Sequence, residues 1–189
     1  ARKLGVRLHT HLAETKDEEH YCLEKFNLRP LKYMETLGWI GNDCWYAHGV
    51  HFTDEEVEEL GRTKTGVAHC PVSNQKLASG VAKVPKMLKA GVPLGLAVDG
   101  SASNDCSNLL AELRAAFLIH RLVASQEAPG GYDILKIATK GGAEILGRKD
   151  IGSLEVGKAA DLFMININRL ELAGAHLDPK SMLATVGFN

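Results

Sequence analysis

The feature that most constrains the fold is an alternation that occurs four times along the chain. A short apolar segment runs into polar side chains, and a helical pattern follows; the apolar segments are residues 6–12, 44–50, 66–70 and 92–98. Strands that alternate with helices over such short distances favour parallel β/α units, because parallel neighbours need a crossover connection that is usually a helix. The sequence therefore predicts an α/β fold with a parallel sheet.

Helical patterns account for much of the remaining chain. We expect helices over residues 16–26, after Pro30, and over 53–62, 84–90, 108–125 and 132–146. Thr53 and Glu56 have the spacing of a capping box, and Gly91 supplies a stop after the fourth of these helices. Local chemistry thus marks the start of the third helix and the end of the fourth, in addition to apolar periodicity.

The remaining segments divide the chain into two units. We predict that residues 1–150 form the β/α part, with residues 71–74 as a loop after the third strand. Residues 151–161 lead into an apolar segment, 162–167, that is predicted to be a strand with no helix after it. Residues 151–189 are therefore interpreted as the start of a small, truncated β-rich domain.

Composition excludes several classes of protein. The 189 residues are 45% hydrophobic, and 22 basic against 23 acidic side chains give a formal net charge of −1, so neither nucleic acid nor an acidic membrane surface is an expected partner. No apolar run approaches the ~20 residues of a membrane helix. The four cysteines are scattered, without a Cys-x-x-Cys spacing. A reducing, cytoplasmic location is the natural expectation.

The end of the first strand leaves two functional interpretations open. His9 and His11 share one face of a strand because side chains alternate, whereas Thr10 points to the other face. The two histidines form a ligand pair in one interpretation. In the other, His11 is the ligand and Glu14 is its acid/base partner. A third, non-functional interpretation is a strand end with solvent-exposed polar residues.

The four strand ends together favour a metal site. Each carries an imidazole or a carboxylate at its carboxyl end, namely His11 with Glu14, His48, His69 and Asp99. Taken singly, His69 is explained as a core histidine and Asp99 as a turn residue. Four such endings at the same edge of a parallel sheet are typical of α/β barrel active sites. Imidazole and carboxylate suit zinc or a similar divalent ion, which acidifies a bound water.

Four motifs carry a resemblance to a known family: His11-Leu12-Ala13-Glu14, Ala47-His48-Gly49-Val50-His51, His69-Cys70-Pro71-Val72-Ser73-Asn74 and Asp99-Gly100-Ser101-Ala102-Ser103-Asn104. In this order they resemble the amidohydrolase superfamily, in the branch that contains guanine deaminase, triazine chlorohydrolases and related aminohydrolases. The resemblance extends to residues 152–161, which are similar to the family's return into its small β domain. It implies a (β/α)8 barrel and hydrolytic deamination of a purine-like ring such as 8-oxoguanine.

The resemblance also implies a role for each site residue. His11 and Asp99 are the implied metal ligands, with zinc as the expected ion and iron as the second candidate. Asp99 accepts a proton from the attacking water, Glu14 delivers a proton to a ring nitrogen, and His48 polarises the water or the substrate.

The other residues of the motifs have less direct implied roles. Ser73 and Asn74 shape the substrate loop, and His69 and Cys70 form the wall of the site more readily than they bind metal. His20, His51, His120 and His176 are left as structural or exposed.

One departure from the family's pattern changes how the chain is interpreted. The family's barrel has eight strands and a His-x-His pair on the first, but only four predicted strands fit between His9 and Asp99, and eight units need about 200 residues or more. His11 with Glu14 matches the fifth-strand motif. We therefore expect the C-terminal half of a barrel, strands five to eight, whose N-terminal half is the missing partner. The complete protein is expected to be a homo-oligomer.

Two hypotheses of different kinds follow. The first is a metal-dependent aminohydrolase, with a triazine-type chlorohydrolase or ethylaminohydrolase as the alternative on the same scaffold. The second is a non-catalytic half-barrel that serves as a partner chain and carries no stoichiometric divalent metal. An isolated half-barrel exposes two unpaired sheet edges, so it should aggregate, pair with itself or fold only with its missing half.

Overall fold

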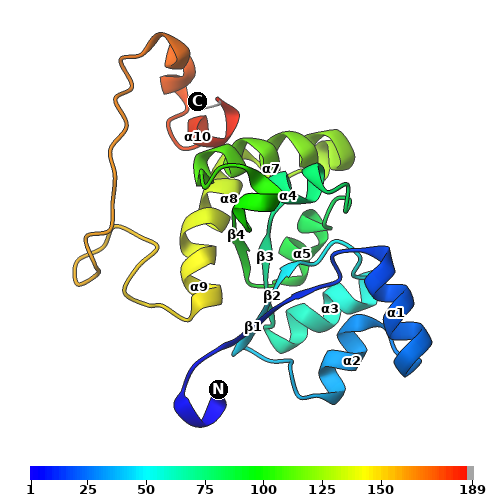
Figure 1. The fold of residues 1–189 in the computed structure, drawn as a ribbon. Coiled ribbons are helices and arrows are strands. Elements are labelled where there is room, and N and C mark those ends of the chain that lie inside the picture. Colours follow the sequence, from blue (N-terminus) through cyan, green and yellow to red (C-terminus); the bar gives the residue numbers. More distant parts are fainter. Residues whose placement is uncertain (187–189) are drawn as a thin grey trace.

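A four-stranded parallel sheet lies at the centre of the computed structural model, which describes residues 1–186 (Figure 1). The strands are β1 (Leu8–Leu12), β2 (Cys44–His48), β3 (Gly66–His69) and β4 (Leu94–Leu96). They follow one another in the order β1-β2-β3-β4, and every neighbouring pair is parallel. The predicted parallel α/β fold is confirmed. The fourth strand is shorter than predicted, because only three of the residues in 92–98 have strand geometry.

Helices connect the strands and cover the sheet. They are α1 (Lys16–Phe26), α2 (Pro30–Thr36), α3 (Asp54–Thr63), α4 (Pro71–Lys76), α5 (Val84–Ala90), α6 (Ser101–Asn104), α7 (Leu109–Ala124), α8 (Gly131–Lys136), α9 (Gly142–Leu146) and α10 (Met182–Thr185). A π-helical turn, Ile137–Gly141, joins α8 to α9, so the predicted helix over 132–146 is interrupted at its centre. None of the helices in residues 1–186 is both long and apolar enough to cross a bilayer.

Local chemistry sets several of the helix ends. Thr53 and Glu56 form the predicted capping box at the start of α3, with both reciprocal hydrogen bonds present. Asn108 caps α7 by accepting a hydrogen bond from the Leu110 amide. The prediction of a loop over 71–74 is wrong, because α4 begins there. Pro71 occupies the first turn of α4, where its fixed φ and missing N–H suit a helix start.

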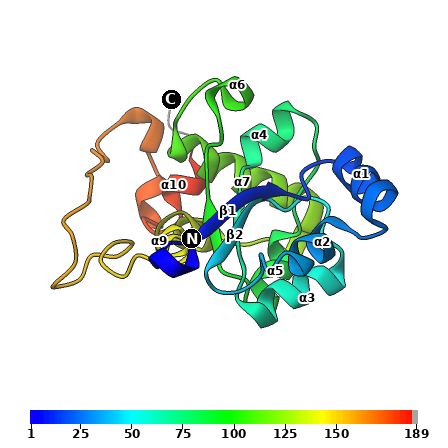
Figure 2. The same cartoon turned by 60° about the horizontal axis from the view of Figure 1, so that its bottom comes forward.

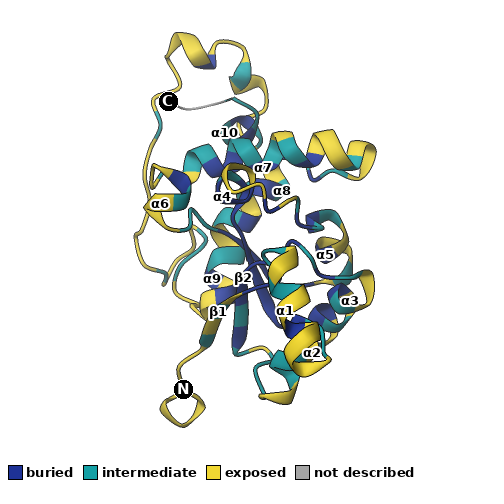
Figure 3. Cartoon of the chain, turned by 45° about the vertical axis from the view of Figure 1, so that its right-hand side comes forward, coloured by how far each residue is buried: buried dark blue, intermediate teal, exposed yellow. Residues whose placement is uncertain are grey.

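The core forms where the helices pack on the sheet. Strands β2, β3 and β4 are almost wholly buried, whereas β1 is buried only at Leu12, and Figure 3 shows the surrounding helices exposed on their outer faces. Tyr46 of β2 and Val67 of β3 are fully buried and belong to the same apolar cluster as Leu60 of α3, Met87 of α5 and Ile134 of α8. Figure 2 shows the chain running from β1 toward α1, with α4 and α6 in the upper part of the view.

The segment after α9 differs from the prediction. Residues 162–167 form no strand, and most of the residues from 154 to 171 are exposed. A strand needs a partner for its backbone hydrogen bonds, and no described strand lies beside this segment. The chain then returns to the body of the molecule, where α10 packs against α7 and α8 (Figure 1). The β-rich domain beginning at residue 151 stays a prediction, and its last residues, 187–189, lie outside the described part.

Two glycines in helices give a matched test of the packing. Gly61 lies where α3 packs on α5, and a Cβ there meets the Ala90 carbonyl oxygen, whereas a Cβ on Gly142 meets no described atom within 4 Å. Gly61→Ala should therefore destabilise the full-length protein by about 1–3 kcal/mol through overpacking. Gly142→Ala should stabilise it by up to about 1 kcal/mol through helix propensity. Urea unfolding measures both, and a stabilised Gly61→Ala variant contradicts the α3–α5 contact.

Candidate functional site

Three strands deliver polar side chains to one point at the carboxyl edge of the sheet. His11 comes from β1, His48 ends β2, and Asp99 follows β4; one potential ligand atom from each lies within 4.8 Å of the others. The strands are parallel and in register, with Leu12 beside His48, so their polar ends coincide. The structure thus brings together three of the residues that the sequence predicts at this site.

His48 is the buried centre of the group. Its side chain is 1% exposed, and its Nδ1 lies 2.9 Å from the Asn74 amide oxygen. Its Nε2 is buried and has no hydrogen-bond partner among residues 1–186; it lies 3.5 Å from Oε2 of Glu14 and 3.9 Å from Oδ2 of Asp99. The ring of His11 meets that of His48 edge-on at 5.0 Å between centroids. A nitrogen that faces two carboxylates and donates to neither is suited to a further ligand at this point.

Asp99 is held by two hydroxyl groups. Ser73 Oγ donates to its Oδ2 at 2.6 Å, and Ser103 Oγ donates to the same oxygen at 2.8 Å. Burial alone raises the pKa of Asp99, but these hydrogen bonds and one from the Gly100 backbone outweigh burial, so the pKa is lowered overall. The group is therefore a carboxylate near neutral pH, as a metal ligand or proton acceptor must be.

Glu14 lies beside His48 because hydrogen bonds to a side chain of α1 hold the backbone at this turn. The side chain of Glu18, in the first turn of α1, accepts hydrogen bonds from the amides of Ala13 and Glu14, both at 2.9 Å. Ala13 has a left-handed φ of 54°, which turns the chain sharply after β1. The Glu14 carboxylate keeps partial exposure, 21%, so it faces both the buried imidazole and the open end of the sheet.

Ser73 and Asn74 occupy positions that the loop prediction did not anticipate. Both are buried on α4, and their side chains bond Asp99 and His48 respectively. Their predicted contact with substrate stays a prediction.

His9 lies outside the group of three. Its ring stacks on Trp45 at 3.5 Å between centroids, and its Nδ1 faces the Trp45 carbonyl oxygen at 3.2 Å. Of the two histidines on this face of β1, His11 alone belongs to the group of three that could hold a metal ion.

A buried histidine pair was missed by the sequence analysis. His69 of β3 and His120 of α7 face each other with their Nε2 atoms 3.1 Å apart, and both are buried. Burial lowers the pKa of His120 to about 4, and burial together with repulsion from His120 lowers that of His69. A signal for this contact exists in α7, where Glu112, Ala116 and His120 share one buried stripe.

Burial also makes Cys70 unreactive, because it raises the pKa of this thiol to about 12.

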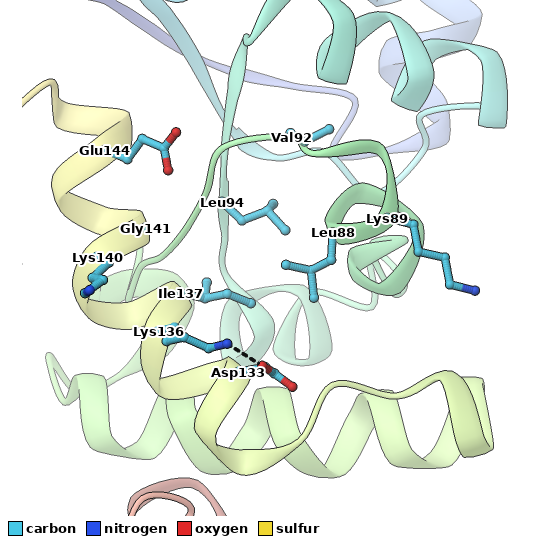
Figure 4. A pocket seen from close by; sticks show the side chains of 10 residues that line it. All are labelled: Leu88, Lys89, Val92, Leu94, Asp133, Lys136, Ile137, Lys140, Gly141 and Glu144. Carbon is cyan, nitrogen blue, oxygen red and sulfur yellow. Dashed lines mark ion pairs between the residues drawn. The ribbon is translucent and has the colours of Figure 1, made fainter.

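A separate pocket of about 540 Å³ lies at the opposite end of β4 from Asp99. Leu88, Leu94 and Ile137 give it an apolar floor, and Lys136 forms an ion pair with Asp133 at its rim (Figure 4). Leu94 begins β4, so the pocket opens at the amino edge of the sheet. Catalytic groups of β/α barrels gather at the carboxyl edge, and this pocket is therefore not part of the candidate site.

The fold and the site together define a class: part of a parallel β/α barrel with imidazole and carboxylate groups at its carboxyl edge. The family model described as "Amidohydrolase family" matches residues 1–188. The chain belongs to the amidohydrolase family.

Named relatives agree with this assignment. The 8-oxoguanine deaminase of Pseudomonas aeruginosa is 49% identical over 183 residues, 97% of this chain and 40% of that protein. The hydroxydechloroatrazine ethylaminohydrolase of a Pseudomonas species is 46% identical over 192 residues, 100% of this chain and 40% of that protein. The chain thus spans about two fifths of the length of these relatives.

Solved structures give the same result for the fold. An adenosine deaminase from Xanthomonas campestris with bound zinc matches with a TM-score of 0.95 and 34% identity, over 99% of this chain and 43% of that chain. An atrazine chlorohydrolase from Arthrobacter aurescens, complexed with zinc, matches with a TM-score of 0.94 and 34% identity, over 100% and 42% of the two chains. The predicted partial barrel is confirmed.

The histidine pair makes stability depend on pH. The folded-state pKa of His120, about 4, is below the ordinary value of 6.5, so the folded state binds fewer protons than the unfolded state between these values. Stability present above pH 6.5 should fall as the pH drops toward 4, by up to about 3 kcal/mol for this residue. His120→Gln in the full-length protein should flatten this dependence in urea unfolding, with the exposed His20→Gln as control. An unchanged slope contradicts the prediction.

Proposed function

We propose that the full-length protein is a metal-dependent aminohydrolase that removes an amino group from a purine-like ring such as 8-oxoguanine. The observation that carries the proposal is the convergence of His11, His48 and Asp99 at the carboxyl edge of the sheet, beside Glu14. The name of the P. aeruginosa relative, 8-oxoguanine deaminase, supports the ring and the reaction. Several further relatives are named as 5-methylthioadenosine/S-adenosylhomocysteine deaminases, which supports deamination more broadly.

The side chains fit a divalent metal, with zinc as the ion that the two solved neighbours contain. Two imidazoles and a carboxylate are ordinary zinc ligands, and the unpartnered Nε2 of His48 lies within the same group. His11 and Asp99 are the proposed ligands from this chain, with His48 beside them. When bound, the metal supplies the acidity that makes water a nucleophile near neutral pH.

The chain's own residues carry the proton transfers. Asp99, held as a carboxylate by two serine hydroxyls, accepts the proton of the attacking water. The partly exposed Glu14 delivers a proton to a ring nitrogen, so that the carbon bearing the amino group accepts the attack. Asp99 then passes the water proton to the amino group, which leaves as ammonia, and the remaining hydroxyl proton returns to Glu14 as the carbonyl forms. His48 orients the water or the substrate through its Nε2. The Asn74 amide oxygen fixes the imidazole ring of His48 through its other nitrogen, Nδ1. The proposed substrate contacts of Ser73 and Asn74 would come from the start of α4.

A second candidate activity uses the same groups. The hydroxydechloroatrazine ethylaminohydrolase is 46% identical to this chain, so hydrolytic removal of an alkylamine or a chloride from a triazine ring is the alternative. Only the leaving group and the ring contacts differ between the two activities. The proposal also includes a cytoplasmic, homo-oligomeric enzyme in which an N-terminal half completes the barrel.

A substrate panel tests the proposal. We expect the purified full-length protein to contain about one zinc per chain and to release ammonia from 8-oxoguanine faster than from guanine, isocytosine or hydroxytriazines. Removal of the metal with a chelator should abolish the activity, and zinc should restore it. Preferential turnover of a triazine supports the alternative. A folded protein without stoichiometric metal and without turnover supports the non-catalytic partner chain instead.

Substitution at Asp99 tests the assignment of the site. Asp99→Asn keeps the size of the side chain but removes the charge and the proton acceptor, so kcat should fall by about a thousandfold or more. The control is Asp150→Asn, because Asp150 is exposed and pairs with Arg148 at the surface, away from α4 and α6. Near-normal turnover of Asp99→Asn in the full-length protein contradicts the assignment.

A further inference from the structure

A buried carboxylate on α7 takes no part in the proposed reaction. Glu112 has no exposed surface, although burial of an ionised carboxylate is costly unless the charge is well bonded. Burial raises the pKa of Glu112, and hydrogen bonds from Val72 and Asn104 oppose that shift. Burying Glu112 therefore costs folding free energy, and its hydrogen bonds offset part of that cost.

Each carboxylate oxygen of Glu112 accepts one hydrogen bond from a different segment. Oε2 accepts from the backbone amide of Val72, in the first turn of α4, at 3.1 Å. Oε1 accepts from the side-chain amide of Asn104, at the end of α6, at 2.6 Å. Asn104 also donates to the Val98 carbonyl, at 2.5 Å, which ties α6 back to the residue before Asp99. One carboxylate thus bonds to both short helices, which also contact each other directly, since Lys76 of α4 donates to the Ala102 carbonyl of α6.

The residues next to these two contacts are the serines that hold Asp99. Ser73 directly follows Val72, and Ser103 directly precedes Asn104. Their hydroxyls both donate to Oδ2 of Asp99. Glu112 is therefore hydrogen-bonded to the sequence neighbour of each serine whose hydroxyl orients Asp99, the proposed metal ligand. Hydrogen-bonding partners behind a ligand carboxylate set its orientation, and their loss typically costs 10–100-fold in metal affinity or activity.

We propose that Glu112 is a positioning residue that sets the orientation of Asp99 for metal through α4 and α6. The inference rests on the proposed function, because it concerns the affinity of the same site. The two hydrogen bonds that Glu112 accepts, from Val72 and Asn104, form a clamp on α4 and α6. Without this clamp, α4 and α6 lose a shared anchor, and the two serine hydroxyls lose their fixed direction toward Asp99. A purely structural role for Glu112 predicts lower stability with unchanged metal affinity in the folded protein.

The first test is Glu112→Gln in the full-length protein. Glutamine keeps the shape, but its amide group faces one of the two N–H donors and so breaks one of the two hydrogen bonds. We expect the zinc dissociation constant, measured by competition with a chromophoric chelator, to rise about tenfold or more. The matched control is Glu127→Gln, since Glu127 is exposed and pairs with Lys89 at the surface. Its zinc affinity should equal that of the wild type.

A double-mutant cycle separates positioning from simple destabilisation. If Glu112 acts through Ser73, the effect of Glu112→Gln on zinc affinity should be smaller in a Ser73→Ala background than in the wild type. Additive effects on zinc affinity overturn the proposal. Should Glu112→Gln not fold, Asn104→Ala breaks the same clamp from the other side, and its cycle with Ser103→Ala gives the same comparison.

The outcomes for the two proposals differ. Wild-type protein that binds no zinc and releases no ammonia contradicts the proposed function and, with it, this inference. Wild-type protein that binds zinc and deaminates, with unchanged zinc affinity in folded Glu112→Gln, contradicts the role of Glu112 alone. Reduced affinity in Glu112→Gln, normal affinity in Glu127→Gln and a coupled cycle support the positioning role.

Discussion

The site depends on the parallel register of four short strands. Because Leu12 lies beside His48 and His69 lies beside Leu96, the strands end together, and the residues after them meet at one edge. His48 and Asp99 both have left-handed φ values, 73° and 62°, at this edge. Such a conformation costs a non-glycine residue roughly 1–2 kcal/mol, and it persists where surrounding contacts determine it. The hydrogen bonds to these two side chains therefore stabilise the backbone turns as well as the polar groups.

Much of the fold was predictable from the sequence because its signals are local. The capping box joins Thr53 and Glu56, three residues apart, and each strand or helix is signalled by its own short segment. The meeting of the polar strand ends follows from the parallel pairing of the strands. Contacts between distant segments carry no such signal. The His69–His120 pair joins residues 51 positions apart, and Glu112 contacts Val72 across 40. The prediction of a strand over 162–167 is wrong. Apolar and β-branched residues give this segment strand propensity, but a strand also needs a neighbouring strand to pair with.

The two outer strands explain why the site residues differ in exposure. Within the described chain β1 and β4 each pair with a single neighbour, and His11 on β1 is exposed whereas His48 on β2 is buried. A sheet edge with free backbone groups tends to pair with another strand, and closure into a barrel removes both edges. The chain covers about two fifths of its relatives, and in the proposed complete barrel additional strands would cover this face of β1. The exposure of His11 and the openness of the sheet edge then have one common cause.

Charge links the buried carboxylate to the proposed metal. Burial is the main cause that raises the pKa of Glu112, and the negative charge of Asp99 adds to it; a cation bound beside Asp99 would offset that second contribution. An ionised Glu112 accepts from Val72 and Asn104 with both oxygens, and this is the arrangement that we propose directs the two serines toward Asp99. A bound cation would therefore favour ionised Glu112, and ionised Glu112 would in turn raise the affinity of the site for the cation. Linkage of this kind is reciprocal, so metal in the proposed site would offset the part of the cost of burying Glu112 that comes from repulsion by Asp99.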